Sequence, residues 1–441
     1  MSFENDIFDL QTSIGSPSPS RAGFGTAMLL SLGETFSDAI RYYSSAKDAN
    51  DDALLSADAK ARLVTAFSQS PRPSKVAVAK RAADTIQIDT LTVLSGAVGT
   101  YTITINGTAY THTVAVTSTV TAVRDALVIL VNDDAELIVT AAPSSTDALT
   151  LTSDSSGEVF TTITTANITV VNTTIGFGVA SHIMALGDAD WFGLVLSTRS
   201  DSDILRAATA IESLKRVFIG QSDSSDIITT ATTDIASQIK SLSFKKSKVF
   251  YHSSDAAHGD IANMCKLLAA DFDQNTPQDE LLSLAGVPVD ETITTTVRNN
   301  LRAKNATCYT LFKGLPATAI GQSAAGFDFE LTITYLWADA RMLEAMAGLM
   351  YRLANSSRRI RFNDQGFAQL SSQAEAVLKS GEDIGHFNFT ELVYKARKDV
   401  PTGDVTAQIF RFQWGAQYSG RVKEVKVTGY ISTDFETLIA A

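Results

Sequence analysis

Residues 26–80 and the part of the chain after residue 180 alternate short apolar runs with segments in which apolar residues recur every three or four positions. The short runs predict strands, and the recurring spacing predicts amphipathic helices. Predicted strands lie at 26–32, 75–79, 191–197, 216–220, 248–251 and 305–312, and predicted helices at 53–69, 201–215, 225–242 and 257–272. Strand, helix and strand at this spacing is typical of βαβ units. The pattern predicts an α/β core with a mixed sheet.

Residues 81–175 follow a different pattern. Threonine becomes very frequent, charged residues become sparse, and polar and apolar residues alternate over 100–105 and 110–116. Asn106-Gly107 lies between these two runs, and this dipeptide is the strongest short signal for a β-hairpin. Further strands are predicted at 136–140, 148–152 and 168–171, and one helix at 120–132. We interpret 81–175 as a β-rich domain inserted into the α/β core.

Both ends of the chain are predicted to form extended arms. Residues 1–25 contain apolar residues without a helical period, followed by a Pro/Ser segment at 16–20 that cannot lie inside a helix; the apolar residues are Ile7, Phe8, Leu10 and Ile14. Near the other end, 406–414 and 420–431 alternate, and the second run includes Val425, Val427 and Tyr430. We expect either an antiparallel pair or strands that add to a neighbouring molecule.

Two further helices are predicted at 338–354 and 364–379. The first carries a stripe of apolar residues that includes Met342, Met346 and Met350, which we assign to a core or an interface. Helix starts are marked by side chains that accept from free backbone amides. On this ground Asp201 or Ser202 is expected to cap 201–215, and Asp255 to cap 257–272. The predicted division is an arm at 1–25, core parts at 26–80 and 176–294, the insertion at 81–175 and a C-terminal domain at 295–441.

Composition narrows the function classes. Of 441 residues, 45% are apolar and 19% charged, and the net charge is -12, so the chain is globular and lacks the basic footprint of a nucleic-acid binder. No apolar run approaches the roughly 20 residues that span a bilayer. Glu4, Asp6 and Asp9 oppose a secretory signal. We expect a protein that remains in a cytoplasm and does not insert into membranes.

Basic residues nevertheless cluster near the C-terminus. One cluster comprises Arg352, Arg358, Arg359 and Arg361, and another Arg411, Arg421, Lys423 and Lys426. Such clusters can form a contact face for an acidic partner, although charge alone favours the alternative that follows. Ordinary variation of charge along a solvated surface is the alternative.

Sequence motifs for catalysis, nucleotide binding or metal binding are absent or weak. The chain has no P-loop, no His-Glu-x-x-His and no Gly-x-Ser-x-Gly. Histidines and acids come together at His252, Asp255, His258 and Asp260, where a loop that starts a helix is favoured over a metal site. Asp188 and Asp190 are assigned to a turn, and Cys265 and Cys308 to buried thiols. We expect no catalytic site, no metal and no cofactor.

Several short segments resemble the tail-sheath proteins of contractile phages. They are PSRAGFGT at 19–26, FSQSPRP at 67–73 followed by VAV at 76–78, DWFGLVL at 190–196, FIGQS at 218–222, LANSS at 353–357 and KEVKVTGYIS at 423–432. Each is short, but they follow the order of the family and flank an inserted β-rich part. The resemblance leaves out most of 81–175 and of 273–300, and 313–336 departs from the family pattern.

The resemblance implies an α/β core built from both ends of the chain, an outward-facing insertion, and hexameric rings stacked around an inner tube. It also implies arms that add strands to neighbouring subunits. The partners would be further copies of this chain, a tail tube protein, and baseplate and tail terminator proteins, in a tail assembled in the cytoplasm of the host bacterium. Charge clustering together with the family layout places Arg352, Arg358, Arg359 and Lys379 on the tube-facing surface.

Three alternatives remain open at this point. The chain could form the sheath of a related contractile machine, such as a tail-like bacteriocin or a secretion system. It could be another virion protein, such as a tube or baseplate part. It could also be an α/β enzyme or binding protein with a β-domain insertion, which would behave as a small monodisperse particle.

Overall fold

A computed structural model describes residues 23–421 and residue 423. These residues divide into two compact units. The sheet unit comprises 23–272 and 277–336, and the hairpin unit comprises 273–276 and 337–423 without residue 422. The long helix α9 (Phe329–Asn355) contains the division, between Leu336 and Trp337. The sequence-based boundary at 294–295 differs, because the strands that follow it belong to the sheet unit.

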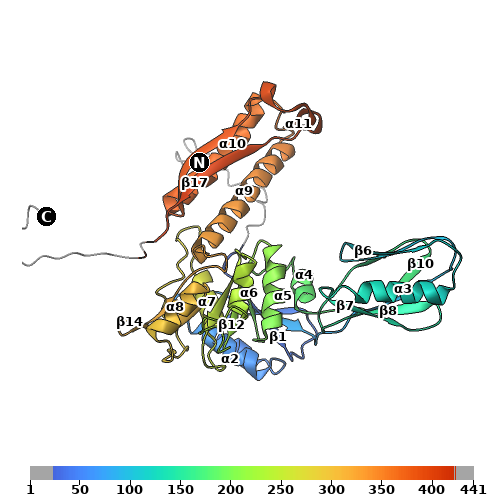
Figure 1. The fold of residues 1–441 in the computed structure, drawn as a ribbon. Coiled ribbons are helices and arrows are strands. Elements are labelled where there is room, and N and C mark those ends of the chain that lie inside the picture. Colours follow the sequence, from blue (N-terminus) through green and yellow to red (C-terminus); the bar gives the residue numbers. More distant parts are fainter. Residues whose placement is uncertain (1–22, 422, 424–441) are drawn as a thin grey trace, which may run out of the picture. The chain divides into compact units, whose positions relative to one another are not determined.

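The sheet unit is built on one eight-stranded sheet (Figure 1). Its spatial order is β15 (Leu315–Ala319), β14 (Thr307–Phe312), β13 (Ser247–Tyr251), β12 (Val217–Ser222), β11 (Gly193–Leu196), β1 (Ala27–Leu32), β3 (Val76–Arg81) and β2 (Ile40–Tyr43). The inner strands pair in parallel, and β15 and β2 pair antiparallel at the two edges. Strands from before and after the Thr-rich segment therefore form one mixed sheet, as predicted.

Helices cover both faces of this sheet because its inner strands are apolar on both sides. Met28 and Leu30 of β1 join one core with residues of α4 (Val179–Ala185), α5 (Asp201–Glu212), α6 (Ile235–Ser241) and α8 (Thr295–Ala303). On the other face, α2 (Ala57–Phe67), preceded by α1 (Ala46–Asp51), contacts α7 (Gly259–Leu268). Residue Gly193 lets α7 approach, because a Cβ there would lie 2.3 Å from the sulfur of Met264.

The Thr-rich segment forms two sheets of its own and a separate core. One sheet has the order β10 (Ile168–Thr174), β4 (Ile88–Val93), β8 (Ala148–Ser153) and β7 (Val139–Pro143); the other has β6 (Thr108–Val114), β5 (Gly99–Ile105) and β9 (Thr162–Thr164). Helix α3 (Val120–Asn132) packs on them, at the predicted position. The predicted hairpin is confirmed: Asn106 and Gly107 both have positive φ, as a two-residue turn between twisted strands requires.

The hairpin unit contains the C-terminal half of α9, helix α10 (Asp364–Ile384) and a two-stranded sheet of β16 (Phe387–Tyr394) and β17 (Phe412–Tyr418). A 3-10 turn (Arg397–Asp399) and α11 (Thr402–Ala407) connect the two strands. Helix α10 ends at Gly385, whose φ of 92° is the left-handed conformation that favours glycine at a helix end. The chain then turns directly into β16.

Several local predictions were wrong. Ser200, and neither Asp201 nor Ser202, accepts from the Asp203 amide at the start of α5, because the helix begins at Asp201 as predicted and its cap is the residue before it. The helix predicted at 225–242 shortens to α6, capped by Asp234. The alternating run at 406–414 is mostly helix and loop, and β17 pairs with β16, a strand that the sequence analysis missed. Most of 420–431 lies outside the described residues.

Candidate interaction surfaces

The reversal of strand order between β1 and β11 is the position where open α/β sheets hold ligands, beyond the carboxyl ends of the strands. Here buried side chains occupy that position. The Arg62 guanidinium contacts Asp260 at 3.2 Å and Asp58 at 2.9 Å, and donates to the carbonyl oxygen of Ser197, with Arg62 2% and Asp260 1% exposed. Burial opposes this charge, but the carboxylates of Asp260 and Asp58 outweigh burial and raise the pKa of Arg62. The crevice is thus closed by an internal ion pair.

The start of α7 closes the same region. Asp255 was expected to cap this helix, but the N-cap residue is His258, which makes no capping hydrogen bond. Instead Gln221 of β12 accepts from the backbone amides of Gly259 and Asp260 at 2.9 and 3.2 Å. A side chain distant in sequence therefore replaces the local cap, and no amide of this first turn is left for an external anion.

The residues considered for metal or thiol chemistry have structural partners. The Nδ1 atom of His252 accepts from the Ser254 amide, so its Nε2 donates to the carbonyl of Pro288. Burial raises the pKa of the Cys308 thiol to about 12. Asp190 pairs with Lys75, and its amide donates to the Tyr42 hydroxyl. Among the described residues, no group of three or more His, Cys, Asp or Glu is arranged to hold a metal ion.

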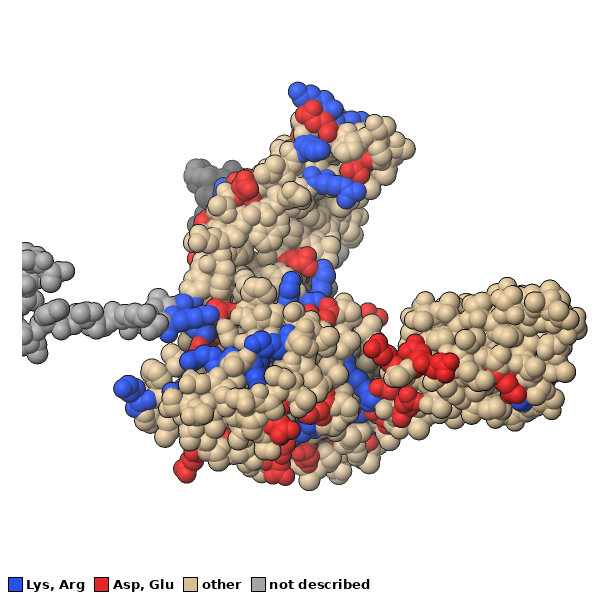
Figure 2. All heavy atoms as spheres, in the orientation of Figure 1, with Lys and Arg blue, Asp and Glu red and all other residues tan. Residues whose placement is uncertain are grey.

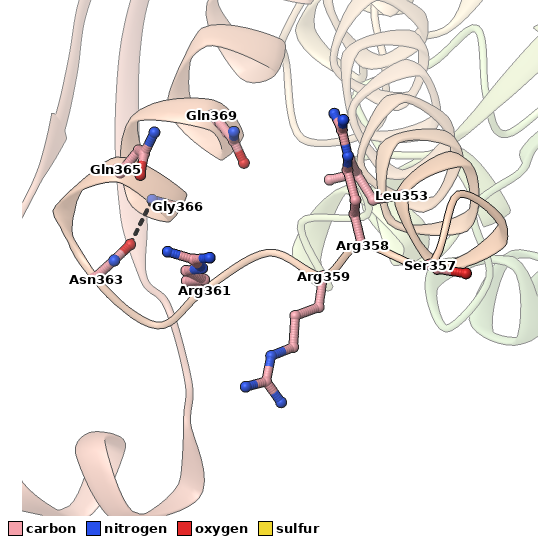
Figure 3. Close-up of a pocket in the computed structure, with 9 residues that line it drawn as sticks. All are labelled: Leu353, Ser357, Arg358, Arg359, Arg361, Asn363, Gln365, Gly366 and Gln369. Carbon is pink, nitrogen blue, oxygen red and sulfur yellow. Dashed lines mark hydrogen bonds between the residues drawn. The ribbon is translucent and has the colours of Figure 1, made fainter.

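Three of the four residues in the first basic cluster, Arg358, Arg359 and Arg361, lie in the loop that joins α9 to α10. A pocket of about 740 Å³ lies there, lined by Leu353, Ser357, Arg358, Arg359, Arg361, Asn363, Gln365, Gly366 and Gln369. Figure 3 shows Arg358 beside the end of α9, Arg361 before the start of α10, and Arg359 pointing away from both. None of these three arginines pairs with a carboxylate of a described residue. Their charges are therefore available to a partner.

The geometry of this loop depends on Asn363 and Gly366. The Asn363 side chain accepts from the Gly366 amide at 2.9 Å and caps α10. A Cβ on Gly366 would lie 1.9 Å from the carbonyl oxygen of Arg361, so only glycine allows the loop to pass this closely over the helix. The sequence analysis did not single out Gly366, although a glycine three residues after an Asn cap is a signal that could have been used.

Of the four residues predicted to face a tube, Arg358 and Arg359 share this pocket. Arg352 lies on the last turns of α9 and does not line it. Lys379 lies on α10 and pairs with Glu375 one turn earlier, at 3.1 Å. Arg361, which belonged to the cluster but not to the predicted set, lines the pocket as well. The predicted arm residues Ile7, Phe8, Leu10 and Ile14, and the predicted strand residues Val425, Val427 and Tyr430, lie outside the described residues.

The β16–β17 hairpin offers a second kind of surface. Each strand has its partner on one side, and the described residues place no third strand beside either of them. The burial of both strands is incomplete, and Val393, Tyr394 and Trp414 are exposed. A two-stranded sheet is marginally stable in water on its own. Both edges can accept an added strand.

The Thr-rich segment differs from both surfaces. Figure 2 shows few charged side chains on its visible face. Hydroxyl pairs such as Thr102 with Thr111, at 3.0 Å across β5 and β6, line its sheets. No described helix of the protein combines the length and apolar character that a membrane-spanning helix requires.

Comparisons with solved structures match this fold along nearly its whole length. A chain of the anti-feeding prophage baseplate, six-fold symmetrised, is 9% identical with a TM-score of 0.50, covering 97% of this chain and 99% of that chain. A chain of an extracellular contractile injection system, the PVC sheath complex in its contracted state, is 10% identical with a TM-score of 0.50, covering 98% and 97%. The sheath tail protein of Listeria innocua is 10% identical with a TM-score of 0.44, covering 86% and 90%.

No protein-family model and no curated protein matches the sequence. The chain shares its fold with a chain of an extracellular contractile injection system and with chains of the anti-feeding prophage baseplate. The predicted resemblance to contractile sheath proteins is confirmed at the level of the fold.

Proposed function

We propose that this protein is the sheath subunit of a contractile tail. In this proposal it polymerises as stacked hexameric rings around an inner tail tube and contracts to drive the tube through a host envelope during genome delivery. The observation that carries the proposal is the match to chains of contractile systems over 97% or more of this chain, across the sheet, the Thr-rich segment and the hairpin unit. The subunit acts in the virion tail and is assembled in the host cytoplasm.

The mechanism is mechanical. The extended sheath is a metastable packing around the tube, and contraction reaches a packing with larger contacts between subunits. The α/β core is the rigid body that moves. The closed crevice at Arg62 supports this role, because that position is filled by the protein's own side chains. The subunit consumes no nucleotide and works without a cofactor or metal.

Arms hold the subunits together while they move. Residues 1–25 and the strand residues Val425, Val427 and Tyr430 add strands to the free edges of the β16–β17 sheet of neighbouring copies. Strand addition satisfies the unpaired backbone groups of an edge and supplies affinity through main-chain hydrogen bonds. The hairpin supports this idea because it has two such edges and little burial of its own.

The tube is contacted through the basic residues. Arg352, Arg358 and Arg359 carry charges without a carboxylate partner among the described residues, whereas Lys379 shares its charge with Glu375 and contributes less. Charge reversal of Arg358 and Arg359 should abolish co-assembly with the tube protein in co-expression. Unchanged co-assembly would exclude this surface. Baseplate and tail terminator proteins bind the two ends of the polymer.

The Thr-rich segment is an inserted domain on the outer surface of the sheath in this proposal. Its separate core and its sparse charges support an independent module.

A second candidate function is the sheath of an extracellular contractile injection system. It is favoured by the matches to chains of the PVC sheath complex and of the anti-feeding prophage baseplate, which cover 97% or more of this chain. Native particles purified with this subunit separate the two. Particles that carry a DNA-filled capsid support a phage tail, and tubes without a capsid support an injection system.

Negative-stain electron microscopy of the purified full chain tests the proposal. We expect hollow cylinders with a helical repeat, because self-assembly is a property of the sheath subunit itself. Uniform small particles that never polymerise at high concentration would contradict it and favour an α/β enzyme or binding protein.

A further inference from the structure

Strand β10 lies at one edge of the four-stranded sheet in the Thr-rich segment (Figure 1). It pairs with β4 on one side, and the described residues place no strand on its other side. Six of its seven residues are exposed, and Val171 is exposed to 63%. An edge strand of this kind pairs readily with another chain unless the fold protects it.

The opposite edge of the same sheet is protected. At β7 the side chain of Asn132 donates to the carbonyl oxygen of Ala141 at 2.9 Å and accepts from its amide at 2.8 Å. Strand β7 also ends at Pro143, which has no amide hydrogen to offer. Strand β10 has neither device, and residues 159–187 around it contain no Asp, Glu, Lys or Arg. The two edges of this sheet therefore differ in their readiness to pair.

The hydrogen bonds of β4 show which backbone groups of β10 point to the open side. The Leu94 amide donates toward β10, to the carbonyl oxygen of Asn167 at 3.0 Å, and the Val93 amide points the other way, toward β8. Backbone groups of an antiparallel strand alternate in direction from one residue to the next. With the observed register of β10 and β4, the amides and carbonyls of Val170 and Asn172 point away from β4.

These four groups have no partner among the described residues. Ile168 points in the same direction, but its amide donates to the carbonyl oxygen of Thr165 and its carbonyl oxygen accepts from Thr164 Oγ1, both at 2.9 Å. No described residue bonds to the backbone groups of Val170 or Asn172. A bulge follows Asn172 and ends the regular strand there. Two amides and two carbonyls are thus left for another chain.

We propose that β10 pairs antiparallel with β10 of a second copy of this chain, about a twofold axis at Val171. In this register Val170 of each copy exchanges two hydrogen bonds with Asn172 of the other, so all four open groups of each strand are used. A twofold axis at Val170 would instead place Asn172 opposite Ile168, whose groups are already bonded. The pattern of open groups therefore selects one register.

Charge favours a second copy as the occupant. Each chain carries a net charge of -12, so two copies repel each other over most of their surfaces. At a twofold axis every residue approaches the same surface of the other copy, and a charged edge strand would meet its own charge. The absence of charged residues from 159–187 removes this repulsion at β10.

The contact goes beyond the sheath function proposed above. Rings that drive a tube in one direction are stacked in one sense, so no twofold axis relates neighbouring subunits within one sheath. The β10 contact therefore joins copies that do not share a sheath, either free subunits or subunits of two adjacent sheaths. An insertion on the outer surface keeps β10 within reach of such copies.

Disulfide trapping tests the contact on the full chain with Val171→Cys. Directly opposed residues that do not exchange hydrogen bonds have Cα atoms about 4.5 Å apart, which lies within the range of disulfides. Both native cysteines are buried, so the introduced thiol is the reactive one. Under mild oxidation we expect a covalent dimer, formed roughly tenfold faster than in controls without the contact.

Two variants serve as those controls. Thr169→Cys lies on the same face of β10, but its two copies would be about 13 Å apart in the proposed register. Ile129→Cys is exposed to 60% on α3, which contacts β6 and β7. Equal rates for Val171→Cys and either control would overturn the proposal.

Proline and charge substitutions test the same contact without cysteines. Val170→Pro removes an amide hydrogen that points away from β4, so it should abolish the dimer in sedimentation while the unfolding midpoint is retained. Val171→Lys and Val171→Glu should each weaken self-association roughly fivefold, because like charges meet at the axis. An equimolar mixture of these two variants should recover dimers, which a folding defect would not allow. Failure of the mixture to associate would contradict the twofold register.

Electron microscopy of oxidised Val171→Cys separates this contact from the sheath function. Cylinders joined side by side support both proposals, and covalent dimers that never form cylinders support the contact and reject the sheath function alone. Cylinders whose subunits cross-link neither before assembly nor between cylinders reject the contact alone. Disulfides confined to single cylinders would overturn the twofold arrangement.

Discussion

The sheet unit buries the strands at its centre completely, whereas the hairpin unit leaves most of its strand residues at least partly exposed. In the sheet unit, every residue of β12 and β13 is buried, and helices cover both faces of the sheet. In the hairpin unit, a single residue of β16 is buried and none of β17 is, while Leu343 and Met350 on α9 are 62% and 60% exposed. The first unit is complete as a folded body. The second leaves strand edges, an apolar groove lined by Met350, Phe362 and Phe410, and arginines that pair with no carboxylate of a described residue.

The ion pairs of the two units also differ in burial. In the sheet unit, Lys248 and Asp279 are fully buried and joined at 2.6 Å, and Asn263 contacts both. In the hairpin unit, Lys379 and Glu375 form an ion pair in solvent. Buried pairs fix one packing, because neither charge tolerates the loss of its partner. Exposed charges can exchange partners, which the contraction proposed above would require.

The largest expected effect is on the apolar core. Phe218→Ala in β12 should destabilise the sheet unit by about 3–5 kcal/mol, because the ring is fully buried and a cavity remains. Phe412→Ala in β17 is the matched change in the hairpin unit and should cost clearly less, since that ring is half-buried. Hydrogen exchange of peptides from each unit under increasing urea measures both. Equal losses of stability for the two variants would contradict the difference in burial between the two units.

Removing the carboxylate from each ion pair tests the difference between the buried pair and the exposed pair. Asp279→Ala leaves the Lys248 ammonium buried without its counter-charge and should cost about 3–5 kcal/mol. Glu375→Ala removes the partner of the exposed Lys379 and should cost about 0–1 kcal/mol. Urea midpoints of the two variants at neutral pH compare them. A small effect of Asp279→Ala would show that water or another carboxylate reaches Lys248.

A glycine substitution tests the conformation of the loop that joins α9 to α10. Gly366→Ala should cost the hairpin unit about 1–3 kcal/mol, because the added methyl collides with the carbonyl of Arg361. Gly403→Ala is the control, since a Cβ there meets nothing within 4 Å. Exchange rates of α10 amides report the loss. If Gly366→Ala leaves them unchanged, the loop does not hold the close approach that orients Arg361.

The smallest expected effect concerns pH at the junction between the Thr-rich segment and the sheet. The Ala82 amide donates to Nε2 of His182 at 3.2 Å, which requires a neutral ring. Burial and the nearby charge of Arg81 lower the pKa of His182, while Asp84 opposes this shift. The unfolded chain then binds the proton more readily, so stability is full above pH about 6.5 and falls as pH drops through the lowered pKa.

The corresponding measurement is the unfolding midpoint between pH 7.5 and 5. The wild-type midpoint should decrease more than that of His182→Gln, which keeps an acceptor that does not titrate in this range. Parallel pH profiles of the two proteins would show that His182 does not couple the junction to pH.

The local pattern was sufficient for most of the sheet unit. Parallel strands between helices are apolar along their whole length, so β1, β3, β12 and β13 were visible in the sequence. The edge strand β2 and the hairpin strand β16 were missed, because a half-exposed strand with polar and charged residues lacks a clear period. The cap of α7 was missed for another reason, since Gln221 reaches it from a strand that is distant in sequence.

For the candidate surfaces, the sequence identified a basic cluster but not its arrangement. Arg358, Arg359 and Lys379 were singled out because of charge clustering together with the layout of the family that the sequence resembles. Only the fold shows that Lys379 is paired and that Arg361 shares a groove with aromatic residues from 362–367 and from 410–412. Contacts between segments that are distant in sequence leave no periodic signal in either segment.

The sequence by itself determined the α/β class, the break in composition at the Thr-rich segment, its Asn-Gly hairpin and the apolar and acidic character of residues 4–10. These are local properties, because backbone preference and side-chain period act over a few residues. The tertiary structure alone decided the order of strands, the ion pair that closes the crevice and the aromatic groove beside Arg359 and Arg361. Those features depend on which distant residues meet, and that choice is made by packing of the whole chain.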